Sequence, residues 1–302
     1  DRLREVGLEP GEDLRRLEVL VVADDPALND LLPPGDGCSP DRADLSAQPR
    51  CRPTFVGRSH DLDHLVGLTS SGGAERVALV EGEPGIGKTW LLEELTHRLE
   101  SEGGTVIRVR CAEDPAGPNR ALSTALDEWV RSVSTDALAS LIGPLTPALC
   151  RVSAAMAVAL PDQEPDPNIQ PESRRHRLLA AMVDLLSRLA DRERTTVVVD
   201  DLHWASDSTV DLLRHCVDAD TGAGFVAAMR SPCDRSPALD AWLAFLTTRG
   251  ALDRRPLSPL AVDDVRLMVE ARLGRCSPDL ADQLHGASGG TAFFVRELIE
   301  HR

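Results

Sequence analysis

Several features that would place a protein in a well-known class are missing from this sequence. None of its apolar runs approaches the roughly 20 residues that a membrane-spanning helix needs. There is no N-terminal stretch of the signal-peptide type, and the first residue is Asp rather than Met. We therefore expect a cytoplasmic location, no membrane partner, and a chain that is a fragment of a longer protein.

Clustered positive charge is also missing. The formal net charge is −16 at pH 7, whereas a protein that reads duplex DNA normally carries a basic face. The densest basic group, Arg174, Arg175 and Arg177, lies in a stretch that also has an apolar side. Contact with DNA or RNA polymerase is therefore expected only through domains outside this chain.

The seven cysteines are dispersed, with no CxxC or Cys/His spacing of the kind that binds metals. Since there is also no secretion signal, we interpret them as reduced cytoplasmic thiols. Metal binding through sulfur is not expected.

What is present is a glycine-rich segment at 82–89, with the order Gly-Glu-Pro-Gly-Ile-Gly-Lys-Thr. An apolar run at 77–80 precedes it and is short enough to be a buried strand. Leucines at helical spacing follow at 91–99, with charged residues on the opposite side of the same predicted helix. A strand, a glycine-rich turn and a helix that starts with Lys-Thr form the context of a phosphate-binding loop.

Each residue type in this segment suits the binding of a nucleotide. Glycines allow positive φ angles and a close approach of backbone N–H groups to phosphate oxygens, and the helix N-terminus adds unpaired donors. Lys88 is expected to neutralise the β and γ phosphates, and Thr89 to ligate Mg²⁺. The predicted nucleotide contacts in and beside the loop are Gly82, Pro84, Gly85, Ile86, Gly87, Lys88, Thr89 and Trp90.

A second apolar run, at 195–199, leads straight into Asp200 and Asp201. Neighbouring side chains of an extended strand point to opposite faces, so the two carboxylates are expected to have different tasks. We predict that Asp200 holds Mg²⁺, through Thr89 or the water shell, and that Asp201 orients a water toward the γ phosphate. The alternative is an ordinary solvated Asp-Asp turn.

The stretch 198–205, Val-Val-Asp-Asp-Leu-His-Trp-Ala, resembles the signature of the ATPase domain in large LuxR-type (LAL) and SARP/AfsR-like bacterial regulators. These are STAND-class ATPases, and the resemblance implies that the nucleotide state switches an activator between closed and active, often oligomeric, forms. Where the family usually continues with Asp-Pro-Ser, this chain has Ser-Asp-Ser at 206–208, which changes a helix cap. His203 and Trp204 are interpreted as packing residues of the turn rather than as catalytic residues.

A further strand, at 225–230, takes its interpretation from the same resemblance. In P-loop ATPases of this class such a strand lies between the strands of Lys88 and Asp200, and its terminal residue senses the γ phosphate. By that analogy Arg230 is the sensor. The alternative is an exposed cation at the end of a strand.

The segment 55–58 resembles the adenine-side motif of AAA-like and NB-ARC ATPases. Family members usually continue with Glu, whereas Ser59 stands here. The residues alone fit equally well a plain helix start that is capped by Ser59, but the distance to the phosphate loop favours adenine contact. The predicted adenine-side residues are Phe55, Val56, Gly57 and Arg58.

The two ends of the chain complete a scheme of domains. Residues 3–17 resemble the tail of the bacterial transcriptional activation domain, which favours the SARP branch of these regulators. The C-terminal stretch resembles the family's helical lid, in which Phe293, Phe294 and Leu298 are expected to be core residues. The predicted scheme is a helical tail at 1–27, a linker rich in Pro, Asp and Gly at 28–52, a P-loop core at 53–256 and a truncated lid at 257–302.

Between these motifs the sequence predicts a strand at 105–109, helices at about 120–134 and 136–147, and a strongly amphipathic helix at 178–189. Alternating strands and helices favour a parallel sheet with right-handed crossovers. The expected fold is an α/β P-loop NTPase with a central parallel sheet flanked by helices, followed by a small helical lid.

The leading functional hypothesis is a regulatory module that binds ATP or ADP with Mg²⁺. Hydrolysis is expected to be slow, because Asp201 is shorter than the Glu of many related ATPases, and to be coupled to ATP-dependent self-association of a SARP-type transcription activator. One alternative is a nucleotide-binding scaffold without turnover. A small-molecule P-loop kinase is less favoured, since neither an Arg-rich lid nor an acceptor pocket is evident. A GTPase would need an Asn-Lys-x-Asp motif, which is absent.

Overall fold

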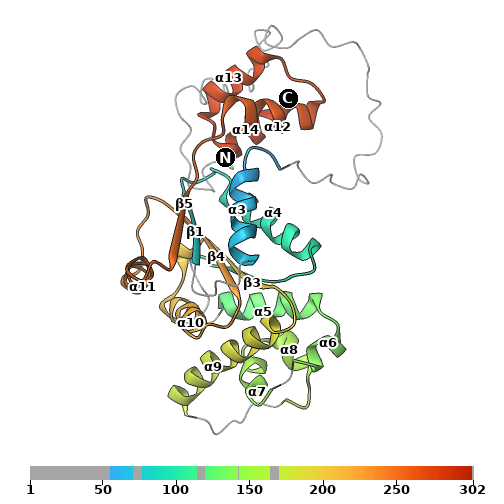
Figure 1. The fold of residues 1–302 in the computed structure, drawn as a ribbon, viewed down its shortest axis with the longest axis vertical. Helices are drawn as coiled ribbons and strands as arrows, with labels where there is room; N and C mark the ends of the chain where they lie inside the picture. Colours follow the sequence, from blue (N-terminus) through green and yellow to red (C-terminus); the bar gives the residue numbers. More distant parts are fainter. Residues whose placement is uncertain (1–54, 71–76, 114–119, 142, 164–169, 301–302) are drawn as a thin grey trace. The chain divides into compact units, whose positions relative to one another are not determined.

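The computed structural model describes residues 55–70, 77–113, 120–141, 143–163 and 170–300 (Figure 1). The predicted tail at 1–27 and linker at 28–52 lie outside the described residues. The described chain forms two compact units: a large one from residues 58–83 and 88–257, and a small one from residues 55–57, 84–87 and 258–300.

The large unit is built on a sheet of five parallel strands in the order β2-β3-β4-β1-β5. This confirms the predicted α/β class and places β4 between β3 and β1. The register pairs Gly82 with Arg230 and Arg110 with Asp200, so these residues lie at the same carboxyl edge of the sheet. The strands are β1 (Val77–Gly82), β2 (Thr105–Arg110), β3 (Thr195–Asp200), β4 (Gly224–Arg230) and β5 (Leu252–Pro256).

The three central strands are buried along almost their whole length, which is why each appears in the sequence as a continuous apolar run. The edge strand β5 has no such run, and the sequence analysis missed it. Its charged residues are paired with neighbouring elements instead: Arg254 donates to Glu81 at 2.8 Å, and Asp253 lies 2.7 Å from the His64 ring. Ion pairs and strand pairing thus replace apolar burial at this edge.

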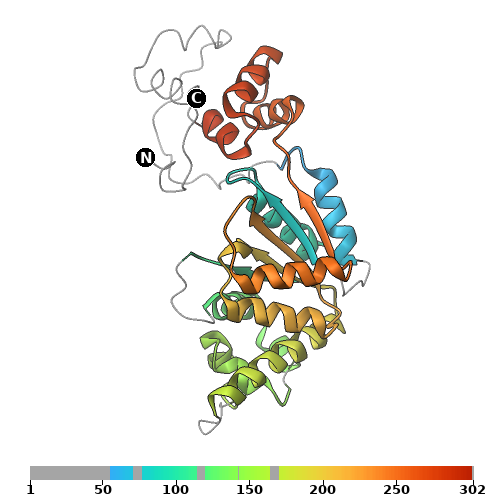
Figure 2. The same ribbon diagram turned by 90° about the vertical axis from the view of Figure 1, so that its left-hand side faces the viewer.

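Helices cover both faces of the sheet, α3 and α4 on one side and α10 and α11 on the other (Figures 1 and 2). The predicted apolar face of α4 is confirmed, since Leu91, Leu92, Leu95 and Leu99 are all buried. No helix in the described ranges is both long and apolar enough to cross a membrane. The bounds are α3 (Ser59–Ser70), α4 (Lys88–Ser101), α9 (Pro171–Ala190), α10 (Asp207–Asp218) and α11 (Pro237–Thr248).

The helical segment between β2 and α9 differs from its prediction. The expected helix at 136–147 is wrong, because two short helices stand there, separated by a turn in which the Gly143 N–H donates to the Thr146 hydroxyl at 2.8 Å. Gly143 and the proline that follows it break the helical backbone. The segment consists of α5 (Arg120–Ser132), α6 (Thr135–Ala139), α7 (Thr146–Cys150) and α8 (Ala154–Ala159).

The small unit contains α12 (Val262–Leu273), α13 (Pro278–Ser288) and α14 (Ala292–Glu300). Its central turn is fixed by Gly290, whose carbonyl accepts from the Leu260 N–H at 2.8 Å. Gly290 has a φ of +72°, and a Cβ there would lie 2.5 Å from the Leu260 carbonyl oxygen. Only glycine fits this position without strain.

The core face of α14 is not the one that was predicted. Ala292, Val295 and Ile299 are buried, whereas Phe293, Phe294 and Leu298 are only half-buried. The two phenylalanine rings meet edge to face at 5.7 Å, and the Arg296 guanidinium lies 5.7 Å from the centre of the Phe293 ring. The helix therefore buries the face of Ala292, Val295 and Ile299 and leaves the aromatic pair half-buried.

Candidate functional site

The loop between β1 and α4 has the backbone that a phosphate-binding loop needs. Gly85 and Gly87 have φ angles of +77° and +105°, which side chains rarely tolerate. Helix α4 begins at Lys88, directly after these glycines, so its unpaired N–H groups belong to the same turn. Within the small unit, the Gly85 carbonyl accepts from the Phe293 N–H at the start of α14, at 3.0 Å.

Lys88 lies in the first turn of α4 and is buried. Its Nζ donates to the carbonyl oxygens of Gly82 at 2.9 Å and Glu83 at 2.8 Å, at the end of β1. Burial lowers the pKa of Lys88, an effect opposed by the Asp201 and Asp200 carboxylates and increased by the Arg230 guanidinium. The Lys88 ammonium is therefore held at the carboxyl edge of the sheet, near Asp201, Arg230 and Asp200.

Asp200 ends β3, and its carboxylate accepts a hydrogen bond from the Asp201 N–H at 3.0 Å. Burial and the neighbouring Asp201 charge raise the pKa of Asp200, whereas the nearby Thr89 hydroxyl lowers it. The two residues predicted to hold Mg²⁺ are thus brought together, and a hydroxyl beside a carboxylate fits this ion, which prefers oxygen ligands. A cation would also offset the repulsion that raises the pKa.

Asp201 is not part of the strand, so the predicted alternation of side chains does not apply to it. β3 ends at Asp200, and Asp201 adopts a left-handed backbone with φ 53° and ψ 44°. Aspartate tolerates this conformation better than most residues. The backbone at Asp201 is therefore set by a left-handed turn and not by strand alternation.

Arg230 ends β4 and is half-buried. Its charge lowers the pKa of both Lys88 and His203, so the three side chains lie in one neighbourhood. The strand order places β4 between β3 and β1, as the resemblance implied. The role of Arg230 as a γ-phosphate sensor stays a prediction.

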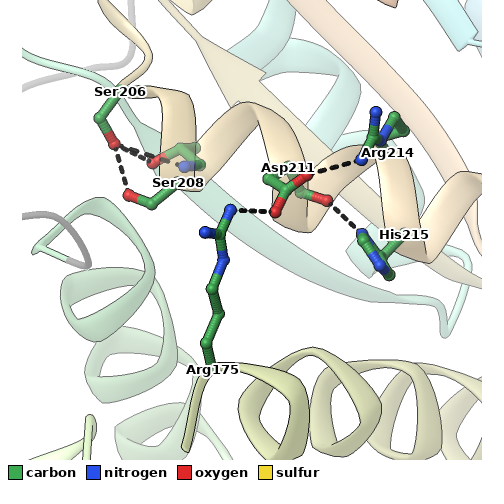
Figure 3. A network of polar contacts seen from close by, with 7 residues as sticks. Arg175, Ser206, Ser208, Asp211, Arg214 and His215 are labelled. Carbon is green, nitrogen blue, oxygen red and sulfur yellow. Dashed lines mark hydrogen bonds and ion pairs between the residues drawn. The ribbon is translucent and has the colours of Figure 1, made fainter. Parts of the chain in front are cut away.

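The turn after Asp201 is a short 3₁₀ helix, η2 (Leu202–Trp204), followed by α10. Ser206 caps α10 by accepting from the Thr209 N–H at 3.3 Å, and its hydroxyl lies 2.9 Å from that of Ser208 (Figure 3). One turn further along α10, Asp211 pairs with Arg214 at 2.8 Å and with Arg175 of α9 (Figure 3). Part of the densest basic group therefore serves to join two helices.

The predicted adenine-side residues divide between the two units. In the small unit Val56 is buried, Phe55 is half-buried, and a Cβ on Gly57 would lie 2.6 Å from Cγ of Asp264. In the large unit Arg58 is buried, with its guanidinium 3.7 Å from the Asp61 carboxylate. Contact with adenine stays a prediction for all four.

Of the remaining loop residues, Ile86 and Lys88 are buried, Pro84 and Trp90 are half-buried, and Thr89 is exposed. His203 lies in the turn after Asp201 and is buried. His203 was interpreted as turn packing, and its ring does contact the Trp204 ring, at 4.9 Å between centres. It also lies close enough to Arg230 and Lys88 for their charges to lower its pKa. In the sequence it stands two residues after Asp201.

The sequence profile of the family described as AAA ATPase domain matches residues 54–226, more than half of the chain. The chain belongs to the AAA ATPase domain family. The matched part of this AAA ATPase domain includes the glycine-rich loop, the acidic strand and its turn, on the five-stranded parallel sheet described above.

The individual relatives are distant. An uncharacterized protein of Rhizobium meliloti is 26% identical over 82% of this chain and 25% of its own length. Among solved structures, a STAND protein with a tetratricopeptide repeat sensor from Pyrococcus horikoshii is 14% identical, with 86% of this chain and 32% of that chain covered and a TM-score of 0.49. C. elegans PCH-2 is 11% identical, with 71% and 46% covered and a TM-score of 0.36.

At these TM-scores the two structures carry no argument about activity or partners. The chain spans about a quarter of the length of the Rhizobium relative and about a third of that of the Pyrococcus protein. Any activity of a whole protein of that size is therefore a matter for proposal.

Proposed function

We propose that this AAA ATPase domain binds ATP or ADP together with Mg²⁺ and hydrolyses ATP slowly. The observation that supports it best is that Thr89 and Asp200 lie close together, beside a lysine that is held by the Gly82 and Glu83 carbonyls. A hydroxyl and an ammonium at the start of a helix, with a carboxylate beside them, are the groups that bind a nucleotide phosphate chain with its metal.

Five residues of the large unit have roles in the proposed reaction. Lys88 exchanges the carbonyl oxygens of Gly82 and Glu83 for phosphate oxygens, and Thr89 and Asp200 hold Mg²⁺. The ion, when bound, neutralises charge on the phosphate oxygens. Asp201 orients the attacking water, and Arg230 responds to the γ phosphate from the end of β4.

Slow turnover follows from the acidic turn. Asp201 is one methylene shorter than glutamate, and it leaves the strand in a left-handed conformation. Its carboxylate therefore reaches less far from the sheet edge than a strand-borne glutamate would. A nucleotide that is held firmly and hydrolysed slowly suits a timed switch better than a metabolic cycle.

The proposed biological setting is a cytoplasmic bacterial transcription activator of the SARP type, for example one that controls antibiotic biosynthesis. The support for it is the resemblance of residues 3–17 and 198–205 to such regulators. In this proposal 1–27 ends an activation domain, 28–52 links it to the ATPase core at 53–256, and 257–302 begins the lid. ATP-dependent self-association is the output, and DNA and RNA polymerase are reached through other domains.

The test is the mass of this chain by light scattering with ADP, with a non-hydrolysable ATP analogue, and without nucleotide. A larger mass that appears only with the ATP analogue, and is lost in Lys88→Ala, supports the switch. Arg98→Ala is the matched control, because Arg98 is an exposed cation on the same helix. A monomer that binds both nucleotides without a change in mass would support the alternative, a nucleotide-binding scaffold.

A further inference from the structure

His203 is a buried residue of the 3₁₀ turn η2. Its side chain is 2% exposed, and neither Nδ1 nor Nε2 has a hydrogen-bond partner in the part of the chain that the structure describes. Buried polar nitrogens are normally hydrogen-bonded, since leaving one unpaired destabilises the fold. If this position only had to be filled, an apolar side chain of similar size would fill it without unpaired polar atoms.

The surroundings of the ring are charged. Nδ1 lies 3.8 Å from Oδ1 of Asp201, which is about 1 Å longer than an N–H···O hydrogen bond. Burial lowers the pKa of His203 to about 4, with further contributions from the Arg230 and Lys88 charges, so the imidazole is neutral at pH 7. A neutral imidazole has one N–H donor and one acceptor nitrogen.

The carboxylate of Asp201 is the complementary unpaired group. Its backbone is fixed on both sides: the N–H donates to Asp200 at 3.0 Å, and the carbonyl accepts from the Trp204 N–H at 2.9 Å. No hydrogen bond to the carboxylate itself is present among the described residues, and the side chain is 38% exposed. The backbone of Asp201 is therefore set, whereas the direction of its carboxylate is not.

We propose that His203 is a positioning residue for ATP hydrolysis, which donates Nδ1–H to the Asp201 carboxylate and so fixes its direction toward the attacking water. This inference rests on the proposed function, in which Asp201 orients that water. The donor is preformed, because the 3₁₀ turn places the ring beside the carboxylate, and only a small movement of either side chain closes the hydrogen bond. Through it the neutral ring holds the carboxylate without neutralising its charge.

The kinetic test compares His203→Leu, His203→Asn and Trp204→Phe in the full chain. We expect His203→Leu to lower kcat for ATP roughly ten- to a hundredfold, as the loss of a hydrogen bond to a charged group does, while the equilibrium affinity for ADP stays within about twofold. His203→Asn carries an amide N–H near the place of Nδ1 and is expected to recover much of the loss. Trp204→Phe is the control for packing in the same turn.

A second arm tests whether His203 acts through Asp201. In an Asp201→Asn background, His203→Leu is expected to cause no further loss of kcat. Independently of turnover, nitrogen NMR of the protein with a non-hydrolysable ATP analogue is expected to show His203 protonated at Nδ1, with His203→Asn used to assign the signal. An Nε2-protonated ring would overturn the proposal.

The outcomes separate the two levels of inference. If wild type hydrolyses ATP, Asp201→Asn does not, and His203→Leu equals wild type, the positioning role is overturned and the proposed function stands. If His203→Asn is as slow as His203→Leu while both remain folded by circular dichroism, the ring acts by shape and the positioning role fails as well. If wild type shows no hydrolysis, the proposed turnover fails and the role of His203 falls with it.

Discussion

The start of α4 and the turn after β3 carry the chemistry of the same site, but their polar groups are in opposite states. At the start of α4, Lys88 is held by two carbonyl oxygens and the Thr89 hydroxyl lies close to Asp200. In the turn, neither the Asp201 carboxylate nor the His203 ring has a hydrogen bond among the described residues. The groups proposed to bind nucleotide are therefore already organised, whereas those proposed to activate water are not. Tight binding with slow turnover is the behaviour that this difference predicts.

The largest expected effect concerns the turn after β3. Asp201→Asn is expected to lower kcat for ATP hydrolysis roughly a hundred- to a thousandfold, because the amide cannot orient water as a carboxylate does. Affinity for ADP is expected to change little, since Asp201 makes no bond that organises the loop. A coupled phosphate-release assay beside equilibrium binding of fluorescent ADP measures both, with Asp207→Asn as an exposed acidic control. Equal losses of affinity and kcat would contradict the proposed difference between the start of α4 and the turn after β3.

The start of α4 is tested by Lys88→Ala. We expect the affinity for ATP and ADP to fall roughly a hundredfold, because a charge-assisted contact with phosphate is lost. Isothermal titration calorimetry measures it, and Arg98→Ala should bind as wild type does. An affinity that survived Lys88→Ala would mean that the loop is not the nucleotide site.

A smaller effect concerns the contribution of the Asp200 charge to the stability of the folded protein. Burial raises the pKa of Asp200 above its value in the unfolded chain, so the charged carboxylate destabilises the fold at a pH above the folded pKa and this cost disappears as the pH falls below the unfolded pKa. Asp200→Asn keeps an acceptor for Thr89 and removes the charge. At pH 7, without nucleotide or Mg²⁺, we expect its Tm to rise by roughly 2–4 °C.

The same variant should reverse its rank when the ligand is present. With Mg²⁺ and ADP, wild type is expected to gain more thermal stability than Asp200→Asn, because the carboxylate then has a cation to hold. Differential scanning fluorimetry with and without EDTA measures the reversal. A variant whose Tm responded to Mg²⁺ as wild type does would remove Asp200 from the metal site.

The smallest effect separates the turn from the helix that follows it. Ser206→Ala removes the cap of α10 and is expected to lower the free energy of unfolding by about 1 kcal/mol. Ser236→Ala removes the equivalent cap of α11 and should cost a similar amount. Urea unfolding gives both values. If Ser206→Ala also lowered kcat tenfold, the turn would depend on its cap and could not be treated as a separate unit.

Much of the large unit could be predicted from the sequence, because its central strands are buried runs and its site lies where parallel strands end. Thr89 and Asp200 are far apart in the chain, yet a loop after one strand and a carboxylate after another must come to the same sheet edge. β5 could not be found in this way, since its Arg254 and Asp253 are held by ion pairs. No periodicity records such pairs.

Three details depended on contacts that a single stretch of sequence does not reveal. The left-handed turn at Asp201 was not foreseeable from a pattern that favours an extended strand. The half-buried side of α14 was predicted to be its core, because large aromatic residues such as Phe293 were given more weight than the aliphatic residues Val295 and Ile299, which are buried. The unpaired ring of His203 became visible only when the surrounding atoms were in place.

Lys88 is the only lysine among the 302 residues; every other basic side chain with a permanent charge is arginine. Apart from the α-amino group, the chain thus offers amine-selective reagents a single target, and it is the atom held by Gly82 and Glu83. The rate of acylation at that one nitrogen reports how often the ammonium leaves its carbonyl partners. Mass spectrometry of peptides after acylation would follow this opening at Lys88, apart from labelling of the α-amino group, in a protein that needs no engineered probe.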